Sequence, residues 1–188
     1  LAQEKGNLHE HTTLALQKVF QSIGSYDSVV CTLPSSYSLF KELRLPFIAK
    51  EKISLILPHE IEPYLPFPLH EAAFDCALVH TELEKGVSDV VVAATQKKYI
   101  KELVEQCNTV QITPDAITVD ILALYGMYRS AAHLYPLQEQ AALIAFDDST
   151  VHIVYLYNGI LKTVRSLTKD IQNPTKNWQS VLFTLQSF

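Results

Sequence analysis

The sequence has 188 residues, and its 15 Lys and Arg against 20 Asp and Glu give a net charge of -5. This length suits one large domain or two small ones, and the acidic balance disfavours nucleic-acid binding, which needs a positive surface for phosphates. The apolar runs, such as 87–94 and 141–146, are far shorter than the roughly 20 residues of a membrane-spanning helix, and we expect no signal peptide.

Hydrophobic periodicity predicts alternating helices and strands over the first 130 residues. Apolar residues at helical spacing indicate helices, and short apolar runs bounded by Pro or Gly indicate strands. In chain order we expect a helix behind Thr12 and Thr13 as N-cap residues and ending at Gly24, strands at 28–33 and 37–45, a helix at 49–57, strands at 72–83 and 87–94, a helix at 96–107, a strand at 110–112, and a helix capped by Thr118 and running to about Ser130.

Proline and glycine positions refine this series. Pro58 and three further prolines up to Pro68 exclude a long regular helix through that stretch. Gly86 separates two strand-like runs, which therefore predict a hairpin.

The last third of the chain changes to consecutive strands, at 141–146, 151–157 and 160–167. Asn158-Gly159 joins the second and third of them and is the strongest local hairpin signal. A closing helix places its apolar residues on one stripe: Trp178, Val181, Leu182 and Leu185.

The histidines and cysteines predict no metal site. His9 and His11 are the closest pair, but residues two apart on a helix point away from each other. Cys31, Cys76 and Cys107 lie at wide spacings within apolar patterns, which is typical of small core residues in a reducing compartment, so we expect a cytoplasmic protein. The motifs of serine hydrolases, zinc proteases and glycine-rich phosphate loops are absent from the sequence.

One polar cluster, Asp147-Asp148-Ser149-Thr150, lies between two predicted strands. Two interpretations are open. It is an ordinary polar turn, which the residues alone favour by roughly four to one, or a nucleotide-phosphate turn whose carboxylates hold Mg²⁺ while hydroxyls and N–H groups bind phosphate.

Residues 43–75 carry an ordered series of short motifs. A strand containing Arg44 ends in Leu45-Pro46, a helix carries a Glu near its end, and Leu65-Pro66-Phe67 leads toward a strand that bears Asp75. This order resembles the PilM/GspL family, the actin-like cytoplasmic components of type IV pilus and type II secretion assembly platforms, related to the cell-division protein FtsA. The resemblance continues over about residues 8–167 and includes a helix start within 117–123.

The resemblance implies an α/β, actin-like fold, with ribonuclease-H-like lobes and an inserted α/β subdomain, of which this chain is an incomplete part. Residues 1–35 and 115–136 would belong to the first lobe, 36–114 to the inserted subdomain, and 137–188 to the start of the second lobe. The family's first phosphate loop would lie upstream of the chain, and its adenosine-side glycines downstream.

The resemblance also implies a function without catalysis. It implies a scaffold at the cytoplasmic face of the inner membrane, which docks the cytoplasmic tail of an inner-membrane assembly protein and a secretion or pilus ATPase. No nucleic acid is expected as a partner, and membrane association would be indirect or through a segment outside this chain. The alternative is an ATP-binding actin-like switch or weak ATPase of the same machinery.

The residues at the second phosphate turn favour the scaffold. Where ATP-binding members carry Asp-Ile-Gly, this chain has Ala145-Phe146-Asp147. A carboxylate about 4 Å from a phosphate oxygen costs on the order of 4 kcal/mol at an effective dielectric constant near 20. We therefore expect Asp147, Asp148, Ser149 and Thr150 to form a degenerate phosphate turn without a cofactor, ATP with Mg²⁺ being the disfavoured alternative.

Overall fold

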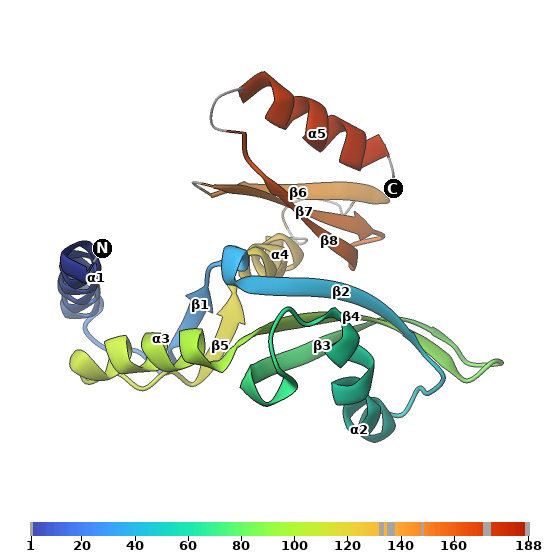
Figure 1. Ribbon diagram of the computed structural model, residues 1–188, viewed down its shortest axis with the longest axis horizontal. Coiled ribbons are helices and arrows are strands. Elements are labelled where there is room, and N and C mark those ends of the chain that lie inside the picture. Colours follow the sequence, from blue (N-terminus) through green and yellow to red (C-terminus); the bar gives the residue numbers. More distant parts are fainter. Residues whose placement is uncertain (1, 132–133, 135–137, 148, 171–173, 187–188) are drawn as a thin grey trace.

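Three small β-sheets form the framework of the described part of the chain (Figure 1). The computed structural model describes residues 2–131, 134, 138–147, 149–170 and 174–186. The first sheet pairs β1 (Val30–Leu33) in parallel with β5 (Ala116–Val119); the second is antiparallel in the order β2 (Ser38–Leu45), β4 (Val87–Gln96), β3 (Ala72–Glu82); the third is antiparallel in the order β6 (Gln140–Phe146), β7 (Thr150–Tyr157), β8 (Ile160–Thr168).

Five helices accompany these sheets in the described ranges. None of them combines the length and the apolar character that crossing a membrane requires. They are α1 (Ala2–Ile23), α2 (Lys50–Ile61), α3 (Lys97–Thr109), α4 (Asp120–Ser130) and α5 (Pro174–Gln186), and short 3-10 turns form η1 (Ser35–Tyr37), η2 (Glu62–Tyr64) and η3 (Leu69–Glu71).

The second sheet is covered on both faces, which explains the β-branched run of its central strand β4. Val90 and Val92 pack on one face against Ile53 and Leu57 of α2. On the other face, Val91 belongs to a core shared with α4 and the third sheet. Because successive strand residues point to opposite faces, a strand buried on both sides needs an apolar run without polar alternation.

The third sheet repeats this arrangement around its central strand β7. Val151 and Ile153 pack against Val181 of α5, which covers the outer face (Figure 1). Val154 and Leu156 point the other way, toward α4 and the second sheet. The third sheet therefore lies between α5 and the rest of the described chain.

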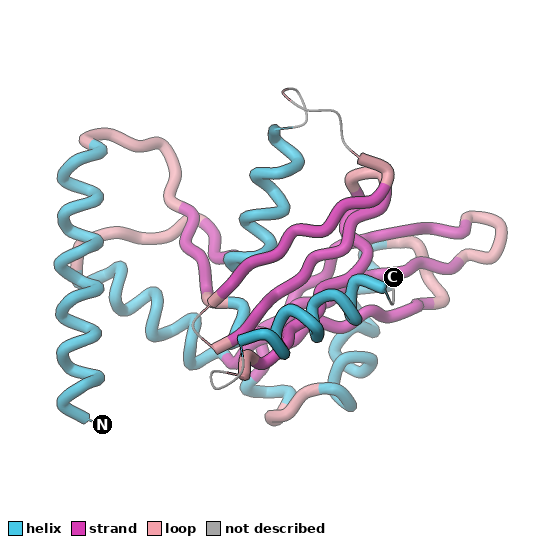
Figure 2. The backbone as a smooth tube through the Cα atoms, turned by 90° about the horizontal axis from the view of Figure 1, so that it is seen from above, coloured by secondary structure: helices cyan, strands magenta, loops and turns pink. Residues whose placement is uncertain are grey.

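The first sheet lies beside α1 and α3 at one end of the molecule, as Figures 1 and 2 both show. Val29, Cys107 and Ile112 are buried there, and Phe20 of α1 packs against them. Gly24 follows α1 with a φ of 77°, a left-handed conformation that glycine adopts without steric cost, and it ends the helix as expected.

The predicted strand at 110–112 is wrong, because these residues form the C-terminal cap of α3. Gln111 has a φ of 63°. Its N–H donates to the Asn108 carbonyl over 3.0 Å, and the Ile112 N–H donates to the Cys107 carbonyl over 3.0 Å. This pair of bonds is a Schellman motif, and the packing of Ile112 against Cys107 supplies its apolar contact.

The cap at Thr118 is also wrong. The strand that was expected at 110–112 is found further along the chain, at β5, and Thr118 is part of it. Helix α4 begins at Asp120, whose side-chain Oδ1 accepts the Ile121 N–H over 2.5 Å. The strand-to-helix change thus falls at Val119-Asp120, within the segment where the family resemblance implied a helix start.

Helix α1 begins at Ala2, about ten residues before the expected cap at Thr12 and Thr13. The stretch Ala2-Gln3-Glu4-Lys5 consists of strong helix formers, so the helix continues upstream of its apolar stripe.

Helix α2 contains Pro58 and ends at Ile61, four residues later than expected. A proline inside a helix costs about 3 kcal/mol. Leu57 and Ile61, on either side of it, are 4% and 0% exposed, and burying such a side chain contributes about 1.5–3 kcal/mol each. Packing on the second sheet therefore offsets the proline, although the stretch to Pro68 continues only as short 3-10 turns.

Glu42 joins the second sheet to the third. Its Oε1 accepts hydrogen bonds from the Thr163 hydroxyl and from Arg165 Nη1, the latter over 2.6 Å, and its Oε2 accepts one from Arg165 Nη2 over 3.3 Å. Partial burial raises the pKa of Glu42, but the hydrogen bonds from Arg165 and Thr163 outweigh it and hold the pKa below the usual 4.5.

We expect Glu42→Gln to lower the free energy of unfolding by up to about 1 kcal/mol at pH 7, because the ion pair is partly exposed. Because the pKa of Glu42 is lower in the folded protein than in the unfolded one, the carboxylate stabilises the fold at pH values above the unfolded pKa. This contribution is lost as the pH falls through the pKa of the folded protein. The difference from wild type should therefore shrink as the pH falls below the usual 4.5, and disappear once the pH is below the lowered pKa of folded Glu42. Urea unfolding at neutral and acidic pH measures it, with the exposed Glu105→Gln as the control that stays near wild type at both; a difference that persists in acid contradicts this prediction.

Candidate functional site

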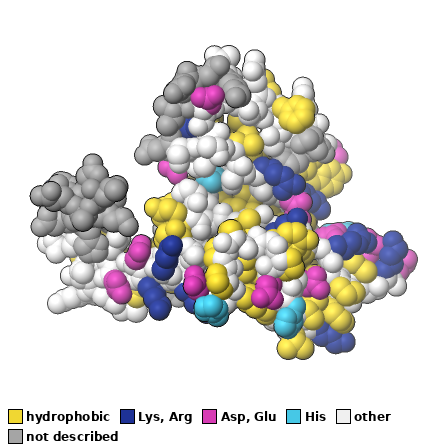
Figure 3. Space-filling model, in the orientation of Figure 1, with side chains coloured by type: hydrophobic (Ala, Val, Ile, Leu, Met, Phe, Trp, Pro, Cys, Tyr) yellow, Lys and Arg dark blue, Asp and Glu magenta, His cyan; other side chains and the backbone are white. Residues whose placement is uncertain are grey.

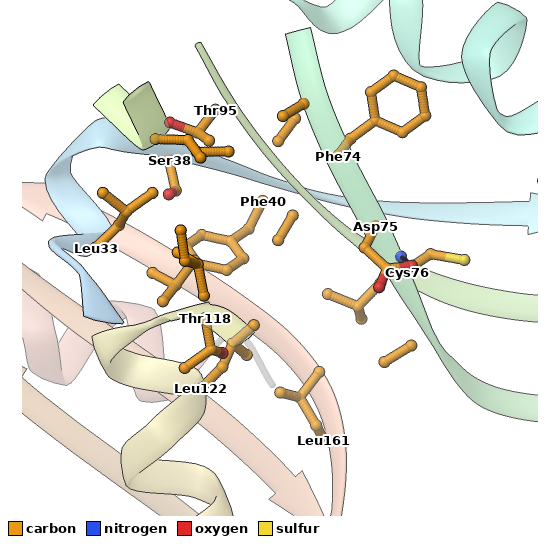
Figure 4. A pocket seen from close by; sticks show the side chains of 18 residues that line it. Leu33, Ser38, Phe40, Phe74, Asp75, Cys76, Thr95, Thr118, Leu122 and Leu161 are labelled. Carbon is orange, nitrogen blue, oxygen red and sulfur yellow. Dashed lines mark hydrogen bonds between the residues drawn. The ribbon is translucent and has the colours of Figure 1, made fainter. Parts of the chain in front are cut away.

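A pocket of about 350 Å³ opens where the three sheets meet (Figure 4). Its floor is one face of the second sheet, where Ala73, Ala77 and Ala93 stand at positions that would otherwise carry large side chains. The register places Ala73 beside Thr95, Ala93 beside Asp75, and Ala77 beside Val91, so all of them share this face. Small residues in adjacent rows leave the hollow, and we name it the alanine-floored pocket.

The walls of the alanine-floored pocket come from the first sheet, the third sheet and two helices. The side chains are apolar and are drawn from segments far apart in the sequence, as Figure 4 shows for Leu33, Leu122 and Leu161. The wall residues are Leu33 of β1, Ile100 of α3, Ile117 and Val119 of β5, Leu122 of α4 and Leu161 of β8.

Few polar side chains line the pocket. The Thr95 hydroxyl donates to the Tyr37 carbonyl over 2.8 Å, and Asp75 Oδ1 accepts the Cys76 N–H over 2.8 Å. Asp75 is the one charged residue among the described residues of the lining. Burial and, to a lesser extent, the Asp75 charge raise the pKa of the neighbouring Cys76 thiol. The pocket thus suits an apolar occupant, with negative charge at one side.

Two strand edges border the pocket. In the order β2-β4-β3, the outer edge of β3 has no neighbouring strand in the described part of the chain. Five consecutive residues of that strand, 73–77, line the pocket, as do three consecutive residues of β5, 117–119. Successive residues point to opposite faces, so the pocket reaches the strand edges themselves, whose N–H and C=O groups pair with extended chains.

The predicted phosphate turn lies between β6 and β7, where the sequence placed it. The Asp147 N–H donates to the Thr150 carbonyl over 2.9 Å, and the Ser149 carbonyl accepts the Lys169 N–H over 2.8 Å. Lys169 Nζ also donates to the Asp147 carbonyl. Asp148 lies outside the described residues. The Asp147 N–H is engaged within the protein. That this turn is degenerate and holds no ATP stays a prediction.

His152, which the sequence analysis did not single out, lies beside this turn and is 2% exposed. Its Nε2 is 3.1 Å from the Thr150 hydroxyl, and its Nδ1 is 2.9 Å from the Ser166 hydroxyl. Burial lowers the pKa of His152, against the opposing effect of Asp120 and Asp147. The imidazole is therefore a neutral, internally bonded part of the sheet.

Within the described residues, no group of three or more His, Cys, Asp or Glu side chains is arranged to hold a metal ion. His9 and His11 lie in α1, and their side chains are outside the described part. The Cys31 and Cys107 sulfurs are 3.7 Å apart, next to the apolar core of the first sheet. The expected absence of a histidine or cysteine metal site stays a prediction.

Charges on the face shown in Figure 3 are mixed in sign. At the end of the β3–β4 hairpin, Arg44 pairs with Glu82 and lies 3.6 Å from Asp89, while Lys85 lies 2.7 Å from Glu82. The described surface there alternates positive and negative groups, rather than offering the positive stripe that nucleic acids require.

The sequence matches a family model, described as type IV pilus assembly protein PilM, over residues 3–158. The chain belongs to this PilM family. The resemblance drawn from residues 43–75 is thereby confirmed. Comparison with curated proteins gives no significant match.

Solved structures support the same fold. A PilM-PilN type IV pilus biogenesis complex matches with a TM-score of 0.72 and 20% identity, covering 84% of this chain and 48% of the other. The cytoplasmic domain of EpsL, an inner-membrane component of the type II secretion system of Vibrio cholerae, matches with a TM-score of 0.56 and 16% identity over 90% of this chain and 59% of that one.

A third structure is a Bacteroides thetaiotaomicron protein with an actin-like ATPase fold and unknown function, with a TM-score of 0.50, 15% identity, and coverage of 94% and 63%. The fold of this PilM-family chain is actin-like, as expected. The chain spans about half to three fifths of the length of these structures.

Proposed function

We propose that this PilM-family chain acts as a non-catalytic scaffold that docks the cytoplasmic tail of an inner-membrane assembly protein in the alanine-floored pocket. The observation that carries the proposal is the pocket itself, an apolar hollow on a small-residue floor between two strand edges. An extended apolar segment fits such a site by placing side chains in the hollow and main-chain groups along the edges.

Two further observations support a membrane-protein tail as the occupant. The structure with a TM-score of 0.72 is described as a complex of PilM with PilN. Cytoplasmic segments next to a membrane span are rich in Lys and Arg, and this chain offers Asp75 in the pocket and a net charge of -5. Attraction between opposite charges raises the rate of such an encounter.

The same proposal includes the place of the chain in its machinery. It would lie at the cytoplasmic face of the inner membrane and also engage a secretion or pilus ATPase. The three sheets support a division into first-lobe segments 1–35 and 115–136, an inserted subdomain 36–114 and a second lobe starting at 137, because each sheet lies within one of these parts.

Calorimetric titration tests the docking. The titrant is a synthetic peptide with the sequence of the cytoplasmic tail of an inner-membrane assembly protein from the same organism, and the cell holds the full-length protein. We expect saturable binding of one peptide per protein. A tail that gives no saturable heat overturns the proposal.

A second prediction separates the scaffold from an ATP-binding switch. Titrating Mg·ATP into the full-length protein should give no saturable heat, because Asp147 places a carboxylate where ATP-binding members carry glycine and its N–H already donates to Thr150. Saturable binding that is lost in Asp147→Ala would instead support the switch, with the carboxylates recruiting Mg²⁺.

A further inference from the structure

Ser38 carries a buried hydroxyl that the fold leaves without a partner. Its Oγ is shielded from solvent and has no hydrogen bond to any residue that the structure describes. Buried hydroxyls are nearly always paired, because an unpaired one loses its bond to water without replacing it. In Figure 4 the hydroxyl points toward the side of the pocket where Leu33 and Phe40 lie.

The neighbouring residue shows that the local structure is able to satisfy a hydroxyl. Thr95 stands directly opposite Ser38 in the register of β2 and β4. The Thr95 hydroxyl donates to the Tyr37 carbonyl over 2.8 Å. The hydroxyl of Ser38, the residue that follows Tyr37, has no such acceptor. An alanine at position 38 would continue the small-residue floor without this cost, so the hydroxyl needs an explanation outside the fold.

An extended polypeptide is the occupant that supplies the missing bond. Its peptide groups recur along the backbone, and a serine hydroxyl is able both to donate to C=O and to accept from N–H. The row of Ser38, Thr95 and Ala73 runs across the floor from β2 to the unpaired edge of β3. A segment that enters at that edge and crosses the floor along this row passes close to Ser38.

We propose that Ser38 is a specificity-determining residue of the alanine-floored pocket, whose hydroxyl forms a hydrogen bond with a main-chain peptide group of the docked segment. This inference rests on the proposed tail docking and names the contact by which the pocket distinguishes a polypeptide from a purely apolar chain.

The proposal is tested first with Ser38→Ala in the full-length protein, which should move two measurements in opposite directions. Removing an unpaired buried hydroxyl should raise the melting temperature by about 2–4 °C. The same change should weaken binding of the synthetic tail peptide by about tenfold, the loss of one hydrogen bond. Ser36→Ala, at an exposed residue two positions before it, is the matched control and should change neither.

An amide-to-ester scan of the tail peptide then locates the partner of Ser38. An ester lacks the N–H and has a weaker carbonyl acceptor. At one position of the peptide, the ester should lower the affinity for wild type about tenfold. The same ester should cause no further loss of affinity for Ser38→Ala.

The outcomes separate this inference from the proposed function. If wild type does not bind the tail, the docking itself fails and the role of Ser38 fails with it. If the tail binds Ser38→Ala as tightly as wild type, while the pocket-filling variant Ala93→Phe does not bind the tail, only the role of Ser38 is overturned. A lower melting temperature of Ser38→Ala also overturns it, since the hydroxyl would then be bonded within the protein.

Discussion

Ala93→Phe should abolish binding of the cytoplasmic tail while leaving the protein folded. Ala93 lies in the floor of the alanine-floored pocket, between Phe40 on one neighbouring strand and Asp75 on the other. A phenyl ring at this position occupies the hollow that an incoming side chain needs. Because the ring enters an existing cavity of about 350 Å³ rather than a packed core, overpacking should cost no more than about 1–3 kcal/mol.

Calorimetry with the synthetic tail peptide measures this effect, and urea unfolding verifies that the variant is folded. The matched control is Ala142→Phe, which adds the same ring at an exposed position of β6 in the third sheet. Its tail affinity should equal that of wild type. Unchanged affinity in Ala93→Phe would place the tail elsewhere on the surface.

Leu156→Ala should lower the free energy of unfolding by about 2–5 kcal/mol. Leu156 is 0% exposed and belongs to the core cluster that joins α4, the second sheet and the third sheet. Truncation removes apolar contacts and leaves a cavity that the surrounding strands fill only partly. The cluster also contains Val119 and Leu161, which are walls of the alanine-floored pocket, so tail affinity should fall as well.

Urea unfolding of Leu156→Ala is compared with Leu182→Ala, the same truncation at a residue of α5 that is 59% exposed. The control should stay within about 0.5 kcal/mol of wild type. Equal losses in the two variants would contradict the placement of Leu156 in a core that joins the second and third sheets.

The helices and strands were largely predictable, because periodicity records which face of an element is buried. The β3–β4 hairpin and the three strands of the last third lie close to their predicted bounds. The errors fall where tertiary packing or backbone geometry outweighs local pattern. Ile61 is buried beyond Pro58, and Gln111 adopts a left-handed conformation that residue type alone does not indicate.

The two candidate sites differ in how far the sequence revealed them. The turn at Asp147 is contiguous, so its residues and its position between strands were visible as a motif. The alanine-floored pocket depends on register, because Ala73, Ala77 and Ala93 share a face only once β3 pairs with β4. The sequence showed only that small residues alternate within the predicted strands. Strand pairing decides that these residues share one face of the sheet.

Leu161 gives the pocket a wall that belongs to the third sheet, and a tyrosine fixes its position. The Tyr125 hydroxyl of α4 donates to the Gly159 carbonyl over 3.2 Å and accepts the Leu161 N–H over 3.3 Å. A tail held against Leu161 therefore favours the arrangement of sheets in which this wall is in place. Binding linkage is reciprocal. A molecule whose binding displaces the third sheet relative to α4 therefore lowers the affinity for the tail, and the bound tail lowers the affinity for that molecule by the same factor.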